Sequence, residues 1–85
     1  MEKSLINVAD LRALIEENID VEAIASEIDG VEGYLLNLNT IDKKMVLSTY
    51  LSTKPRLFKR SDALLKEARE LGLTSVKFEF LTKSA

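Results

Sequence analysis

The sequence predicts a small α+β domain of two layers, in which an antiparallel or mixed sheet of three to four strands is covered by helices. Apolar residues recur at helical spacing near the N-terminus, alternate with a period of two in the middle, and show both patterns again near the C-terminus. The predicted order is α-α-β-β-(β)-α-β. Eighty-five residues, 46% of them hydrophobic, suffice for one core. We therefore expect a single domain over 1–85, with an acidic helical part over 1–32 and a hairpin, helix and strand over 33–85.

The first third of the chain predicts two short acidic helices. Asn7 has the character of an N-cap, and the carboxylate of Asp10 suits the positive end of a helix dipole. Apolar residues at helical spacing then favour a helix over 8–18. A second helix is expected over 20–28, ended by Gly30, because glycine takes the left-handed conformation after a helix at no steric cost.

The middle of the chain predicts a β-hairpin. Residues 34–39 alternate with a period of two, and residues 45–52 are rich in β-branched and aromatic side chains. The polar connection TIDKK has hairpin length and places Lys43 and Lys44 at the tip. The stretch RLF, residues 56–58, is expected to be a short edge strand or an extended approach to the next helix.

The last third predicts a helix followed by a strand. Ser61 or Asp62 is expected to cap a helix over 61–72, and Gly72 to end it. The stretch TSVKFEF then predicts a strand within 75–81 with one solvated face. Three of its residues are expected to point inward: Val76, Phe78 and Phe80.

The composition argues against an enzyme. Cysteine and histidine are both absent, which removes the commonest transition-metal ligands and the most versatile nucleophile and base. The glycines do not form a phosphate-binding loop. Two carboxylate pairs, Glu16 with Glu17 and Glu27 with Asp29, could do acid-base chemistry, but solubility and dipole matching explain them as well. We expect no catalytic residues, no metal and no cofactor.

The sequence also predicts the cellular setting. The absence of cysteine fits a reducing compartment. The stretch MEKSLINVADL lacks the pattern of a signal peptide, and no window approaches the roughly 20 apolar residues of a membrane span. A cytoplasmic protein with no membrane partner is expected.

Charge is unevenly distributed along the chain. Residues 1–42 contain ten acidic and two basic residues, a net charge of −8, whereas residues 43–85 contain ten basic and four acidic residues, a net charge of +6. Either the two halves face each other, or one half is displayed to an oppositely charged partner. A third interpretation is that both are ordinary solvated surfaces.

The basic half contains a candidate anion-binding edge. Basic side chains beside a helix N-terminus can bind phosphate, so the approach to the last helix and the hairpin tip are candidates for contact with nucleic acid. The alternatives are a protein partner, or basic residues that only protect a sheet edge from aggregation. The candidate residues are Lys43, Lys44, Lys54, Arg56, Lys59 and Arg60.

The acidic half supports a rival hypothesis. A surface dense in carboxylates could bind a basic protein surface, or the basic edge of a second copy in a homodimer. The candidate residues are Glu16, Glu17, Asp20, Glu22, Glu27, Asp29 and Glu32.

The run YLSTKPRLFKRSDALLKEARELGLTSVKFEF, preceded by a strand such as GYLLNLN, resembles the C-terminal portion of short accessory proteins of plasmids and other mobile elements. The resemblance covers Gly33 to Leu81. It implies a non-catalytic accessory or regulatory protein of a mobile genetic element. With the basic residues, the expected function is binding to an acidic partner such as DNA through the basic edge. The alternative is a protein-protein interaction module or an inhibitor, for example of a host defence complex, that binds through its acidic helices.

Overall fold

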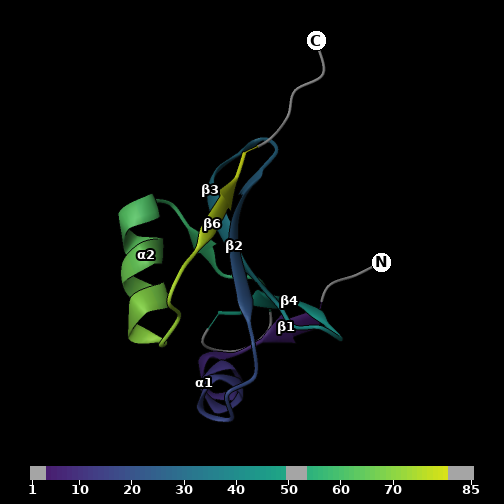
Figure 1. Ribbon diagram of the computed structural model, residues 1–85. Helices are drawn as coiled ribbons and strands as arrows, with labels where there is room; N and C mark the ends of the chain where they lie inside the picture. Colours follow the sequence, from purple (N-terminus) through teal and green to yellow (C-terminus); the bar gives the residue numbers. More distant parts are fainter. Residues whose placement is uncertain (1–3, 50–53, 81–85) are drawn as a thin grey trace.

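The structure, a computed structural model, describes residues 4–49 and 54–80. These residues form two helices and one mixed sheet of six strands (Figure 1). The elements, in chain order, are β1 (Ser4–Ile6), α1 (Val8–Glu16), β2 (Glu22–Ile28), β3 (Val31–Asn39), β4 (Lys44–Leu47), β5 (Leu57–Phe58), α2 (Ser61–Glu70) and β6 (Lys77–Glu79).

The sheet is built around the hairpin of β2 and β3. Its strand order is β1-β4-β3-β2-β6, and β5 pairs with β3 beyond the end of β4. The β2–β3, β3–β4 and β3–β5 pairs are antiparallel, whereas the two outer strands, β1 and β6, pair in parallel with β4 and β2. The mixed sheet is therefore confirmed, but it has six strands rather than three or four.

The segment between β4 and β5, called the excursion below, joins two strands that pair with the same edge of β3. Thr49 N–H donates to the Lys54 carbonyl and Arg56 N–H donates to the Leu47 carbonyl, both at 2.9 Å. An isolated bridge joins Ser48 to Pro55. The excursion is thus closed at its base by backbone pairing. The strand expected over 45–52 ends at Leu47 in regular structure, and its residues 50–53 lie outside the described part.

The second helix expected from the sequence is wrong, because residues 22–28 form strand β2. Val21, Ile24 and Ile28 fit a helical stripe, but the burial pattern alternates instead, with Ala23 and Ala25 buried. Alanine is compatible with either pattern, so the alternation was not visible in the sequence. The acidic N-terminal part therefore holds one helix and two strands, since β1 was not predicted at all.

The small side chain of Ala25 lets two aromatic rings meet over β2. Ala25 lies between Leu36 on β3 and Phe78 on β6. The ring of Phe78 contacts that of Tyr34 edge to face, with centroids 5.5 Å apart. This contact favours the strand conformation of β2 through residues that are far away in the sequence.

Helix α1 begins as predicted and ends earlier than predicted. The Asn7 side chain accepts a hydrogen bond from Asp10 N–H at 2.8 Å, which confirms the N-cap. Asn18 takes a positive φ of 61°, and Ile19 N–H donates back to the Leu14 carbonyl at 3.1 Å. This is a Schellman ending with asparagine in the left-handed position, and it turns the chain into β2.

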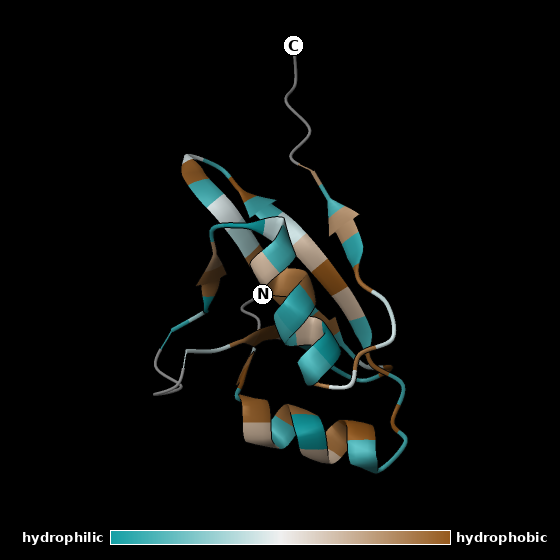
Figure 2. Cartoon of the chain, turned by 90° about the vertical axis from the view of Figure 1, so that its left-hand side faces the viewer, coloured by the Kyte–Doolittle hydropathy of each residue, from teal (hydrophilic) through white to brown (hydrophobic). Residues whose placement is uncertain are grey.

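The two helices are placed differently on the sheet. Figures 1 and 2 show α2 alongside the sheet, whereas α1 lies across one end of it. Leu11 from α1 and Leu64 and Leu71 from the α2 region belong to one core cluster with Leu36 and other sheet residues. The arrangement is thus a small mixed α/β domain that departs from a simple two-layer stack. Neither helix is long and apolar enough to cross a membrane.

The C-terminal third agrees best with the sequence. The left-handed Gly72 follows α2, and Leu73 N–H donates to the Ala68 carbonyl at 3.0 Å, as a Schellman ending requires. Strand β6 is confirmed over 77–79, but Phe80 is 69% exposed and does not point into the core as expected. Leu81, the last residue of the predicted strand, lies outside the described residues.

Candidate functional site

The basic segment, residues 54–60, runs along β5 into the first turn of α2. Its backbone is fixed at both ends, because Lys54 and Arg56 close the excursion and Phe58 pairs with Tyr34 on β3. Phe58 is only 4% exposed. The buried aromatic side chain anchors the segment while the neighbouring lysine and arginine side chains reach solvent. The cations of the basic segment are Lys54, Arg56, Lys59 and Arg60.

Arg56 is held in place on two sides. Its guanidinium carbon lies 4.5 Å from the centroid of the Phe58 ring, and its Nη1 donates to Glu67 Oε1 on α2 at 3.2 Å. The cation-π contact and the partly buried ion pair restrict the side chain, which is 41% exposed. Arg56 therefore joins the segment to α2 as well as adding charge to the surface.

Arg60 occupies the N-cap position of α2, so the prediction that Ser61 or Asp62 caps this helix is wrong. Its backbone is extended, and no side chain caps the first turn. The Arg60 guanidinium instead donates to both carboxylate oxygens of Asp62, at 3.0 and 3.1 Å. Because both side chains are largely exposed, the ion pair adds little stability. The N–H groups of the first turn of α2 thus have no side-chain acceptor among the described residues.

The two hairpin lysines lie apart from the basic segment. Lys44 is opposite Asn39 on β3, whereas Phe58 is opposite Tyr34, so five residues of β3 separate the two positions. At about 3.4 Å per residue the separation is about 17 Å. The six candidate cations therefore form two groups along one side of β3: Lys43 with Lys44, and the basic segment.

The acidic candidates also divide into two groups. Glu16 and Glu17 close α1, and Asp20 and Glu22 lead into β2. The other group lies at the opposite end of β2, in and around its turn into β3. It comprises Glu27, Asp29 and Glu32. All seven are exposed except Glu27, which is half-buried.

The acidic and basic halves of the sequence contribute strands to the same sheet. Strands β2 and β3 of the acidic half pair with β4, β5 and β6 of the basic half. The cations before α2 are next to the acidic turn, since the Phe58 carbonyl oxygen would lie 2.7 Å from a Cβ added at Gly33. The two halves thus pair within one sheet, which agrees with the first of the three interpretations drawn from the charge pattern.

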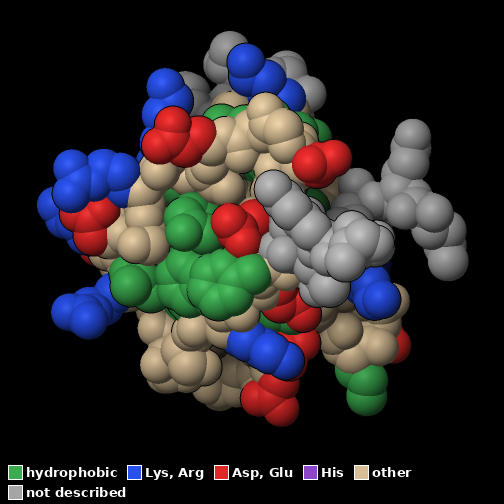
Figure 3. Space-filling view, turned by 90° about the horizontal axis from the view of Figure 1, so that it is seen from above, with side chains coloured by type: hydrophobic (Ala, Val, Ile, Leu, Met, Phe, Trp, Pro, Cys, Tyr) green, Lys and Arg blue, Asp and Glu red, His purple; other side chains and the backbone are tan. Residues whose placement is uncertain are grey.

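Basic side chains are also present further along α2. Seen from above, Lys and Arg side chains gather on the side where α2 lies, next to a patch of hydrophobic side chains (Figure 3). Lys66 and Arg69 of α2 are exposed. They provide charge on the same side of the molecule as the basic segment, at least one helical turn beyond the N-terminus of α2.

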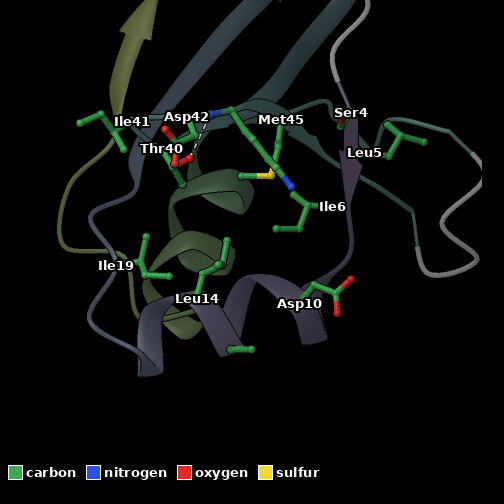
Figure 4. Close-up of a pocket in the computed structure, with 12 residues that line it drawn as sticks. Ser4, Leu5, Ile6, Asp10, Leu14, Ile19, Thr40, Ile41, Asp42 and Met45 are labelled. Atoms are coloured by element: carbon green, nitrogen blue, oxygen red, sulfur yellow. Dashed lines mark hydrogen bonds between the residues drawn. The ribbon is translucent and has the colours of Figure 1, made fainter.

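Two hollows border α1, and Ala13 lines both of them. The first, of about 530 Å³, lies between β1, α1 and the β3–β4 turn, and its lining is mainly apolar (Figure 4). Leu14 and Ile19 line one side of it and Met45 the other, while Ile41, in the turn, is 98% exposed. Its polar lining residues are Ser4 and Asp10, and Thr40, Asp42 and Lys43 of the turn.

The second hollow, of about 910 Å³, lies between α1 and the base of the excursion. The first turn of α1 and Arg12 form one wall, and Ser48, Thr49 and Arg56 form the other. Ser48 is 3% exposed, and its hydroxyl has no hydrogen-bond partner among residues 4–49 and 54–80. Two arginines, a helix N-terminus and a buried hydroxyl without a partner among the described residues thus line one hollow.

Sequence reasoning found only part of the second hollow. The N-cap Asn7 and the cation Arg56 were identified from local patterns. Arg12 was counted only as a rare cation of the acidic half, and Ser48 was assigned to a strand. No local signal could have brought them together, because the excursion that places Ser48 beside α1 depends on the pairing of β4 and β5 with β3.

Within residues 4–49 and 54–80, no three acidic side chains are grouped closely enough to hold a metal ion. Comparisons with protein-family models, with curated proteins and with solved structures give no significant match to this chain.

Proposed function

We propose that the protein is a non-catalytic, cytoplasmic binding protein that contacts an acidic partner, with DNA as the first candidate, through its basic segment. The observation that carries the proposal is the placement of that segment. A buried phenylalanine fixes its backbone beside an N-terminus of α2 that has no side-chain cap, and four cations lie within the seven residues that lead into this helix. Backbone N–H groups and cations together suit phosphate oxygens.

The surrounding charges are compatible with phosphate contact. The Arg60–Asp62 pair is exposed, so exchanging Asp62 for a phosphate as the partner of Arg60 costs little. Lys43 and Lys44, about 17 Å away, would contact the same partner roughly five base pairs further along B-DNA, at about 3.4 Å per base pair. A role as an accessory or regulatory factor of a mobile element, implied by the resemblance of Gly33 to Leu81, belongs to this proposal.

The test is fluorescence anisotropy of labelled single- and double-stranded DNA with two variants of equal charge change. Lys59→Gln with Arg60→Gln should weaken binding roughly tenfold at low salt and flatten its salt dependence, because two phosphate contacts are lost. Lys66→Gln with Arg69→Gln, further along α2, is the control and should bind almost as the parent does. Arg56 is left intact because it also holds α2 through Glu67.

Equal weakening by both variants would point to nonspecific attraction and contradict the assignment of the basic segment. The absence of DNA binding by the parent protein at about 50 mM salt would exclude DNA as the partner.

A second candidate function is favoured by the C-terminal end of α1. Its last residues, Glu16 and Glu17, are acidic, and no basic residue lies in its last turn. The negative end of the helix dipole makes this arrangement unfavourable in isolation, so a cationic protein partner would be stabilised there. Glu16→Gln with Glu17→Gln should then weaken binding to a lysine-rich peptide, whereas Glu32→Gln should not. Unchanged peptide binding in the first variant would contradict this candidate.

A further inference from the structure

The second hollow brings hydrogen-bond donors together from both of its walls. On the helical wall, Val8 and Ala9 are the first two residues of α1, and their N–H groups have no acceptor within the helix. Asn7 caps only the N–H of Asp10, and its carbonyl accepts from Leu11. Two amides and the positive end of the α1 dipole are therefore available to an anion in the hollow.

Two guanidinium groups belong to the same hollow. Arg12 lies one turn along α1 from Val8 and is exposed, and no ion pair with another described residue holds it. Arg56 comes from the opposite wall, where Glu67 engages its Nη1. A guanidinium has five N–H donors, so Arg56 keeps donors for a ligand while Glu67 fixes its position.

Ser48 supplies an independent indication of a ligand. It lines the hollow and is 3% exposed, and its buried hydroxyl oxygen has no hydrogen-bond partner in the described part of the chain. Buried hydroxyls in native proteins nearly always have a partner, so an unpartnered one beside a hollow marks a position where a bound group completes the bonding. Its backbone is fixed by the bond from Ser48 N–H to the Ile6 carbonyl at 2.9 Å.

One acidic side chain also lines the hollow. Glu16 lies at the far end of α1, seven residues beyond Ala9, which is about 10 Å along the helix axis at about 1.5 Å per residue. Its charge therefore favours an anion at the N-terminal end of the hollow and disfavours one at the other end. The volume of about 910 Å³ exceeds that of a lone phosphate, so a phosphate at the N-terminal end would leave room for the group attached to it.

We propose that this hollow binds a phosphate monoester, whose oxygens accept hydrogen bonds from the amides of Val8 and Ala9, from Arg12 and Arg56, and from the Ser48 hydroxyl. Phosphate suits the site because it has several acceptor oxygens and a charge near −2 at neutral pH. This site differs from the proposed DNA contact. The hollow would bind a terminal phosphate or a small phosphorylated molecule, whereas the basic segment would contact the phosphodiesters of the DNA backbone on an open surface.

The test is an NMR titration of the ¹⁵N-labelled protein with inorganic phosphate at constant ionic strength. The amide signals of Val8 and Ala9 should shift in a saturable way. Arg12→Gln should weaken phosphate binding about tenfold or more, and Ser48→Ala should weaken it several-fold. Arg69→Gln is the control and should leave binding unchanged. The amide spectrum of each variant shows whether α1 remains folded, and Arg12→Gln is expected to fold because Arg12 is exposed.

Parallel titrations distinguish two sources of the phosphate. A nucleoside 5′-monophosphate that gives the same shifts as inorganic phosphate supports a small phosphorylated ligand. An oligonucleotide that binds more tightly with a 5′-phosphate than without one, and is weakened by Arg12→Gln, supports the end of a nucleic acid strand.

Three results would contradict the proposal that the second hollow binds phosphate. They are no saturable shift at Val8 and Ala9, shifts confined to Ser61 and Asp62 at the start of α2, or equal phosphate binding by Arg12→Gln and the parent. Lys59→Gln with Arg60→Gln separates the two proposals, because it should weaken DNA binding by the basic segment roughly tenfold and leave phosphate binding in the hollow intact.

Discussion

At the scale of single residues, Gly33 shows how tightly β3 and β5 are joined. Its φ of +135° is one that other residues rarely adopt, and a Cβ at this position would lie 2.7 Å from the Phe58 carbonyl oxygen. The clash involves backbone, which cannot rotate away as a side chain can. Gly33 therefore fixes the distance between the acidic turn and the basic segment.

Gly33→Ala should lower the free energy of unfolding by about 2 kcal/mol or more, from strain and the clash together. Gly30→Ala is the matched control, because Gly30 also has a positive φ but a Cβ there meets nothing within 4 Å. Gly30→Ala should lower the free energy of unfolding by about 1 kcal/mol. Urea denaturation of both variants measures the difference, and equal losses would show that the approach of Phe58 is not tight.

Sequence patterns predicted the structure correctly at positions whose conformation depends on neighbouring residues in the chain. The Asn7 cap and the Gly72 ending of α2 were predicted correctly, because each depends on a few neighbouring residues. The α2 cap was not, since Arg60 occupies the N-cap position and Asp62 bonds to its side chain. The exposure of Phe80 was also missed, because it follows from where β6 ends at Glu79.

At the scale of elements, β2 shows what local patterns cannot decide. Its isoleucine and valine spacing suits a helix, and its alternating alanines suit a strand. The strand forms because β3 and β6 pair with it on both sides, and these partners come later in the chain. The same non-local pairing produces the excursion between β4 and β5, and hence the second hollow.

Helix α1 carries an unfavourable charge at its C-terminal end. Glu16→Gln with Glu17→Gln should raise the free energy of unfolding by about 0.5 kcal/mol, because two negative charges are removed from the negative end of the dipole. Glu32→Gln, at an exposed position in β3, removes a charge far from α1 and should change stability little. Urea denaturation at low salt gives both values, and a loss of stability in the double variant would contradict this reading of α1.

At the scale of the whole molecule, the charge pattern of the sequence does not become two opposite faces. Strands of the acidic and basic halves pair with one another in one sheet, and the candidate residues of each sign divide into two groups. The individual charged residues of the basic segment could be identified from the sequence. Which residues of different elements lie close together could be determined only from the topology of the sheet.

The interleaving of charge bears on self-association. Head-to-tail pairing of an acidic with a basic region, one expectation from the sequence, needs two separate faces, so we expect any self-association to depend little on salt. Sedimentation velocity at about 50 and about 500 mM salt measures this. A dimer that forms at about 50 mM salt and dissociates at about 500 mM salt would contradict the expectation.

The central proposal is that the basic segment contacts the phosphates of an acidic partner, and the salt dependence of DNA binding tests it most directly. Five exposed cations would contact the DNA: Lys54, Lys59 and Arg60 of the segment, and Lys43 and Lys44 of the hairpin. The slope of log affinity against log salt should therefore be about −4.5 for duplex DNA, at about −0.9 per phosphate contact. Lys59→Gln with Arg60→Gln should reduce it to about −2.7. An unchanged slope in this variant, or no binding by the parent at about 50 mM salt, would contradict the proposal.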